Sequence, residues 1–168
     1  MHTPDSLHTA LTALNIPYEV HHHPAVFTVE ESAAHIAHLP GAHIKNLFVK
    51  DKARNLYLIT ALEDRALSLK ALGKHLGARD NLSFADETLL WDTLGVKPGS
   101  VTPLALINAA PGSLRFVLDT GITAQTHALP HPLTNTQTTS LLTTDLISAI
   151  KSWGHTPELL DLSLFPRT

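Results

Sequence analysis

The sequence predicts one α+β domain, in which helices flank a mixed, largely antiparallel sheet. Helical patterns and strand-like runs follow one another without a regular strand–helix–strand alternation, and several connections have the length of hairpin turns. Glycines are single and dispersed, so no Gly-rich phosphate loop follows a strand. The chain has 168 residues. A domain of this size buries about 70% of the surface that its unfolded chain exposes, so residues 1–168 are expected to fold as one unit.

Composition excludes several classes of function. The chain has no cysteine, which rules out disulfides, thiolate zinc sites and a cysteine nucleophile. It contains 12 Lys and Arg against 15 Asp and Glu, a balance that disfavours an autonomous nucleic-acid binder. Basic residues nevertheless cluster locally, as Lys45, Lys50, Lys52 and Arg54 do. No leader-like or membrane-length apolar run is present, so we expect a soluble, cytoplasmic protein with no membrane partner.

The N-terminal third predicts a helix, a short strand and a second helix. Leucines at helical spacing indicate a helix from Thr3 to about Asn15, and Tyr18–His21 alternates like a strand. Thr28 and Glu31 form a capping-box pattern, in which each side chain satisfies a free N–H of the first helical turn. The helix that follows has a small-residue face and is stopped by Leu39-Pro40-Gly41.

The middle of the chain predicts a hairpin and two helices. Asn46–Asp51 and Asn55–Leu62 are β-prone runs joined by a short turn. Helices follow at Arg65–Leu76, which Gly77 stops, and from Asp86 to Leu94, which Gly95 stops, with a brief extended piece at Ser83–Phe84 between them.

The last third is expected to be mostly strands. Strands are predicted at Leu104–Asn108, Leu114–Asp119, Ile122–His127 and Gln137–Leu142, punctuated by glycines and prolines. A final helix capped by Thr143 or Thr144 ends near Trp153, and the tail from about residue 154 is expected to be irregular.

Metal and nucleophile chemistry find little support in the sequence. The chain has 12 histidines. His35 and His38 share a helix face at a spacing suited to two ligands, but no third ligand is indicated, so we expect no metal and no cofactor. No Gly-x-Ser-x-Gly elbow occurs. Adjacent Glu63 and Asp64 would diverge on an extended chain and are interpreted as solvated charges.

Three remaining features together suit acyl-transfer chemistry. Lys45 follows the second helix, His131 lies between prolines, and a loop flanked by prolines offers backbone N–H groups. A cation, a polar side chain and backbone donors around one pocket would serve an enzyme without a nucleophile of its own. The loop residues are Gly99, Ser100, Val101, Thr102 and Pro103.

Four motifs in this order resemble a known family. They are Val26-Phe27-Thr28-Val29-Glu30-Glu31, Lys45-Asn46-Leu47-Phe48, the stretch from Gly95 to Pro103, and His131-Pro132-Leu133 followed by Asn135. The chain is similar to the YbaK/ProX family of free-standing trans-editing deacylases, relatives of the editing domain of bacterial prolyl-tRNA synthetase. Within it, the sequence looks most like the ProXp-ala branch.

The resemblance implies a trans-editing hydrolase that deacylates mischarged tRNA(Pro), with alanyl-tRNA(Pro) as the favoured substrate. By this carry-over, Lys45 contacts the terminal adenosine, Asn46 is its polar neighbour, and His131 is the pocket histidine. The Gly99–Pro103 loop would cradle the ester. The partners implied are the tRNA(Pro) acceptor end and, in addition, prolyl-tRNA synthetase or an elongation factor.

Selectivity would require a pocket too small for proline, because a missing methylene changes synthetase binding by only about 1–3 kcal/mol. We expect the wall of that pocket among Ala33, Ala34, Ile36 and Leu129. Two alternatives stay open at this point. One is cysteinyl-tRNA(Pro) as the substrate, and the other is a non-catalytic module that binds tRNA or the synthetase.

Overall fold

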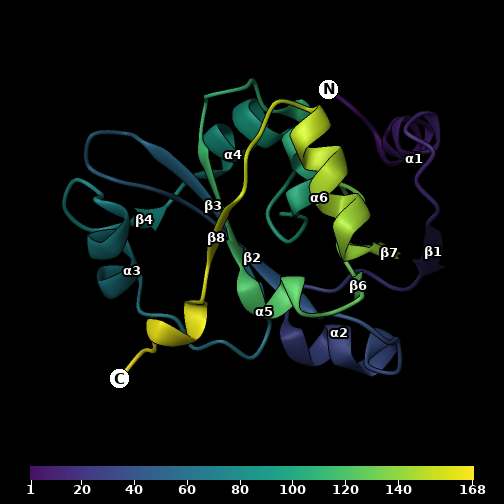
Figure 1. The fold of residues 1–168 in the computed structure, drawn as a ribbon, viewed down its shortest axis with the longest axis horizontal. Helices are drawn as coiled ribbons and strands as arrows, with labels where there is room; N and C mark the ends of the chain where they lie inside the picture. The colour runs from purple at the N-terminus through teal and green to yellow at the C-terminus, as the bar shows by residue number, and fades with distance from the viewer.

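A five-stranded mixed sheet forms the centre of the computed structural model, which describes residues 1–168. Its strand order is β4-β2-β3-β5-β8, in which the pairs β4–β2 and β2–β3 are antiparallel and the pairs β3–β5 and β5–β8 are parallel. This confirms the predicted α+β class with a mixed sheet (Figure 1). The strand bounds are β2 Ile44–Lys50, β3 Leu56–Leu62, β4 Ser83–Phe84, β5 Arg115–Asp119 and β8 Glu158–Leu160.

A second, three-stranded sheet packs beside the first. It has the order β1-β7-β6, with antiparallel pairs throughout, and consists of β1 Glu19–His22, β6 His127–Ala128 and β7 Gln137–Leu142. The two sheets are linked at Ala42, which donates to His127 O at 2.8 Å and accepts from Leu129 N at 3.2 Å. Because Ala42 lies two residues before β2, this link holds the start of β2 next to the chain that leads to His131.

Most helices begin where the sequence offers a capping side chain. The last helix does not, because its N-cap is Leu142 and the predicted caps Thr143 and Thr144 lie within its first turn. Thr3, Thr28, Ser68 and Asp86 each accept a hydrogen bond from a backbone N–H in the first turn of the helix that follows. The bounds are α1 Pro4–Ala13, α2 Val29–Ile36, α3 Leu69–Leu76, α4 Glu87–Leu94, α5 Thr120–Thr123 and α6 Thr143–Ser152, with 3-10 helices η1 Pro103–Asn108 and η2 Leu162–Leu164. None is long and apolar enough to cross a membrane.

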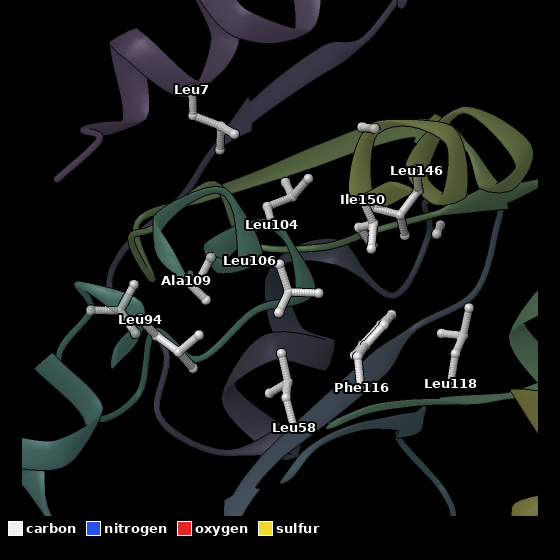
Figure 2. Close-up of a cluster of buried hydrophobic side chains, with 14 of the residues drawn as sticks. Leu7, Leu58, Leu94, Leu104, Leu106, Ala109, Phe116, Leu118, Leu146 and Ile150 are labelled. Carbon is white, nitrogen blue, oxygen red and sulfur yellow. The ribbon is translucent and has the colours of Figure 1, made fainter. Parts of the chain in front are cut away.

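Both faces of the central strands are buried. Leu58 of β3 and Phe116 of β5 point into the larger core, where side chains from η1 and α6 meet them (Figure 2). Tyr57 and Ile59 alternate onto the opposite face and pack under α3 with Leu162. The sheet that carries the site is therefore supported from both sides.

Two predicted strands are helical turns instead. Leu104–Asn108 belongs to η1, because Pro103 occupies its first turn and the Thr102 hydroxyl accepts from Leu104 N at 3.2 Å. The predicted strand Ile122–His127 begins inside α5, because the Asp119 carboxylate accepts from Gly121 N at 3.0 Å and starts that helix at Thr120; only His127 is in a strand, as the first residue of β6. In both places a local cap overrides the apolar pattern.

The chain after residue 154 is ordered structure, contrary to the expected irregular tail. β8 adds to β5 in parallel, and Leu162 is only 1% exposed. A three-residue strand has too few positions to show a periodic pattern, and its partner lies about forty residues earlier in the chain. The second helix and the third also differ at one end each, since α2 ends at Ile36 and α3 begins only at Leu69.

The role of the C-terminal segment can be tested within η2. Leu162 is buried in the smaller core cluster, whereas Leu164 is 68% exposed. Leu162→Ala is expected to lower the free energy of unfolding by about 2–4 kcal/mol, because it leaves a cavity. Leu164→Ala should change it by less than about 0.5 kcal/mol. Urea unfolding of the two variants measures the difference, and equal effects would mean that the segment does not dock.

Candidate functional site

A cleft of about 190 Å³ lies where α2, the start of β2 and two loops meet. Its volume is below the roughly 300 Å³ at which pockets for drug-sized ligands begin, so it suits a small group. The lining residues come from four separate segments of the chain: Val26, Phe27, Thr28, Val29 and Ser32; Ile44, Lys45, Asn46 and Glu63; Gly99 and Val101; and His131.

Lys45 supplies the cation of the cleft. It lies on β2 opposite Ala61 of β3, and its Nζ donates to the carbonyl oxygen of Arg65. Burial lowers the pKa of Lys45 from its ordinary value, the charge of Arg167 lowers it further, and Asp64 acts in the opposite direction. The amine is thus a half-buried donor whose direction is fixed by a backbone carbonyl.

Asn46 supplies a free amide donor beside Lys45. Its Oδ1 accepts from the Thr60 hydroxyl at 2.6 Å across the β2–β3 pair. With the oxygen engaged by a donor, the Nδ2 group has no acceptor within the protein. The two N–H bonds of Asn46 therefore remain for a ligand in the cleft.

His131 is held as a neutral ring. Its Nδ1 is 3.1 Å from the carbonyl oxygen of Gln137, so this nitrogen carries the proton and donates. Burial lowers the pKa of His131; the hydrogen bond to Gln137 opposes this, and nearby His23 adds to it. Since the ordinary value is already 6.5, the ring is neutral at pH 7, and Nε2 is available as an acceptor.

Phe27 and Gly99 form the mouth of the cleft. Gly99 has φ +87°, and a Cβ built on it would lie 2.8 Å from Cδ1 of Phe27. The chain before α2 is tied down by Asn135, whose Nδ2 donates to Val26 O at 3.1 Å. The peptide N–H groups of Gly99 and Val101 have no acceptor within the protein. A glycine here therefore lets an aromatic ring lie against the loop while two backbone donors stay open.

The structure brings together part of the predicted site. Lys45, Asn46, His131, Gly99 and Val101 all line the cleft. The other three loop residues do not. Ser100 is buried and donates to Lys97 O, whereas Thr102 and Pro103 are buried at the start of η1.

The four predicted wall residues lie outside the cleft lining. Ala33 and Ala34 are exposed on α2, whereas Ile36 and Leu129 are buried at 6% and 4% exposure. The residues of α2 that do line the cleft are Val29 and Ser32. They are three positions apart and so share one helix face. Ala33 lies four positions after Val29, on the border of that face, and Ala34 lies away from it.

Other lining residues were missed by the sequence interpretation. Glu63 lines the cleft although it was interpreted as a solvated charge, because its N–H donates to His43 O and holds it at the end of β3. Ile44 was not singled out, and Phe27 was quoted only as part of the first motif. The signals in the sequence were that motif, Val26 to Glu31, and the i, i+3 spacing of Val29 and Ser32.

Comparison with known proteins now gives the family. The family model for the aminoacyl-tRNA editing domain matches residues 23–149, which include every residue of the cleft. The chain belongs to this family. It is 45% identical over 159 residues to the mouse prolyl-tRNA synthetase associated domain-containing protein 1, covering 92% of this chain and 94% of that protein.

A bacterial relative and a solved structure agree with this assignment. The prolyl-tRNA editing protein ProX of Acetoanaerobium sticklandii is 31% identical over 153 residues, covering 90% of this chain and 93% of that protein. A crystal structure of a proposed trans-editing enzyme for prolyl tRNA synthetase superposes with a TM-score of 0.73. It covers 100% of this chain and 99% of that one at 18% identity, which shows a shared fold.

The contact between Gly99 and Phe27 can be tested against a glycine with the same backbone strain. Gly77 has φ +74° and nothing within 4 Å of a built Cβ, so Gly77→Ala reports strain alone. Both alanine variants should lose about 1–2 kcal/mol of stability from the left-handed backbone. Only Gly99→Ala should also shift the Phe27 ring resonances in NMR spectra. Unchanged Phe27 signals would show that the ring does not rest on Gly99.

Proposed function

We propose that this protein is a trans-acting hydrolase that deacylates mischarged tRNA(Pro), with alanyl-tRNA(Pro) as its main substrate. The observation that carries the proposal is a small cleft in an editing-domain chain that combines a cation, a neutral histidine and open N–H donors. The acceptor end of tRNA(Pro) would bring the ester into the cleft, and prolyl-tRNA synthetase or an elongation factor would deliver it.

The cleft contains no activated nucleophile of its own. Thr28 and Ser32 are its hydroxyl side chains, and neither is hydrogen-bonded to a histidine or carboxylate. Water is therefore the nucleophile that fits. Water adds to the ester carbonyl carbon, the carbonyl oxygen becomes an oxyanion, and the bond to the ribose oxygen then breaks. The products are the free amino acid and tRNA with its terminal hydroxyl restored.

Each polar group has a task in this reaction. The open N–H groups of Gly99 and Val101, with the Asn46 amide, are donors for the oxyanion. Nε2 of neutral His131 can accept a hydrogen bond from the attacking water and orient it. Lys45 provides positive charge for the anionic acceptor end. The vicinal ribose hydroxyl of the substrate would help to activate the water.

Amino-acid selectivity would come from the wall of the cleft. Val26, Val29, Ile44 and Val101 are the aliphatic side chains that line it, whereas Ile36 and Leu129 are buried outside the lining. Proline needs room for a ring that alanine lacks, so the side chains of the wall, and not the total volume of the cleft, would have to exclude it. Cysteine is intermediate in size, so a direct assay has to separate cysteinyl from alanyl substrates.

The proposed activity is tested with alanyl-, cysteinyl- and prolyl-tRNA(Pro). We expect the wild type to hydrolyse alanyl-tRNA(Pro) fastest and to be indifferent to a chelator. Lys45→Ala should reduce the rate by at least about 100-fold, since the loss of a charged, partly desolvated contact costs several kcal/mol. Lys52→Ala is the matched control, because this exposed lysine lies in the β2–β3 turn, outside the cleft, and its ion pair is with Asp80. Full activity of Lys45→Ala would contradict the mechanism.

The selectivity wall is tested by two single truncations. Val29 lines the cleft and is 41% exposed, so Val29→Ala should enlarge the pocket at little cost to stability. Hydrolysis of prolyl-tRNA(Pro) is expected to rise at least about tenfold, the effect of a missing methylene. Ile36→Ala, the change suggested by the sequence, removes a buried side chain that does not line the cleft, so it should raise prolyl hydrolysis less than Val29→Ala. The ratio of prolyl to alanyl hydrolysis in each variant identifies the wall.

A further inference from the structure

A fully buried carboxylate lies next to the site but outside the cleft. Asp119, at the end of β5, is 0% exposed. Its Oδ2 accepts from Leu62 N at 3.1 Å and from Arg65 Nε at 3.0 Å, and its Oδ1 accepts from Gly121 N at 3.0 Å. Burial alone would raise the pKa of Asp119, but the hydrogen bonds from Arg65 and the two backbone groups hold it below its ordinary value. The carboxylate is thus ionised at neutral pH.

This anion fixes the turn that receives Lys45. Leu62 and Arg65 are the two ends of the turn after β3, and Arg65 N donates back to Leu62 O at 3.1 Å. Both ends are therefore held by the same oxygen of Asp119. The carbonyl of Arg65, which belongs to the second of these anchored residues, accepts the hydrogen bond from Lys45 Nζ. A rigid acceptor is thereby placed at the amine of the cleft.

The C-terminal segment closes the same turn from the other side. Arg167 N donates to Ala66 O at 2.6 Å, and Ser68 N donates to Phe165 O at 2.8 Å. Two charged residues near this turn act on the pKa of Lys45. Arg167 disfavours the cationic form of the amine, and Asp64 favours it. The turn cannot move away from Lys45 without breaking these contacts.

We propose that Asp119 and Arg65 are a positioning pair that aims the Lys45 amine into the cleft. The inference rests on the proposed function, because it assigns the pair to the reaction of that site. A lysine side chain has four rotatable carbon–carbon bonds, and holding it in one direction lowers the entropy lost when substrate binds. Neither residue lines the cleft, so each acts only through Lys45.

The pair is tested by replacing the arginine rather than the carboxylate. Removing the Asp119 carboxylate would leave Leu62 N and Gly121 N without an acceptor, whereas replacing Arg65 leaves Asp119 these two backbone donors. Arg65→Ala keeps the backbone carbonyl but frees the turn. We expect kcat/KM for alanyl-tRNA(Pro) to fall at least tenfold, and Arg65→Lys to restore a large part of it. In a Lys45→Ala background, Arg65→Ala should have no further effect, because the two residues act in series.

The chain provides a matched control for loss of an ion pair. Arg115 pairs with Glu158 through two hydrogen bonds of 2.8 Å and 2.6 Å at the opposite end of β5, away from the cleft. Arg115→Ala should lower thermal stability as much as Arg65→Ala or more, while deacylation stays at the wild-type rate. If Arg115→Ala lost activity in the same proportion as Arg65→Ala, the effect would be structural and the proposal would be wrong.

A second measurement does not depend on activity. The order parameter of the Lys45 Cε–H bonds, measured by NMR relaxation, should be high in the wild type and in Arg115→Ala and clearly lower in Arg65→Ala. An unchanged order parameter would overturn the positioning role even if the enzyme were active. If the wild type hydrolysed none of the esters, the proposed function would fail, and the order parameters would still decide whether the pair positions Lys45.

Discussion

The buried carboxylate of Asp119 is the interaction on which the largest part of this structure depends. Its hydrogen bonds join the end of β3, the start of α5 and the turn at Arg65, and Leu162 N approaches it at 3.5 Å. Burying an anion is costly unless every lone pair is satisfied, and here backbone donors and a guanidinium satisfy it. One carboxylate thus caps α5, anchors the end of β3 and binds the guanidinium of Arg65, whose carbonyl accepts from Lys45 Nζ.

The cleft itself depends on a second set of contacts, between segments that are far apart in the chain. Val26 and Asn135 exchange hydrogen bonds, and Phe27 rests on Gly99. These contacts hold α2 over the start of β2 and next to His131. The neutral state of that histidine comes from the same enclosure, because burial disfavours its charged form. The site is assembled from four loops and strand ends on a rigid two-sheet frame, a common arrangement for catalytic residues.

Local chemistry explains why much of the fold was predictable. Caps at Thr3, Thr28 and Asp86, and the glycine stops at Gly77 and Gly95, set helix ends within a few residues. The β2–β3 hairpin followed from two apolar runs with a short turn. The sequence predictions failed where a cap or a distant strand determined the secondary structure. The Thr102 cap did so at η1, and pairing with β5 did so at β8. In the site, the motif residues Lys45, Asn46 and His131 line the cleft, whereas the residues expected to form the wall lie outside its lining.

The sequence by itself determined the class of fold, the helix and hairpin positions, and the family, because these depend on local propensity and on motifs read in order. Only the tertiary structure decided which residues face one another. Val29 and Ser32 of α2 line the cleft whereas Ala33 and Ala34 do not, and strand pairing brings Asp119 within reach of Arg65. Such contacts join residues tens of positions apart. Their geometry is fixed by packing in the core and not by the spacing of residues along the sequence.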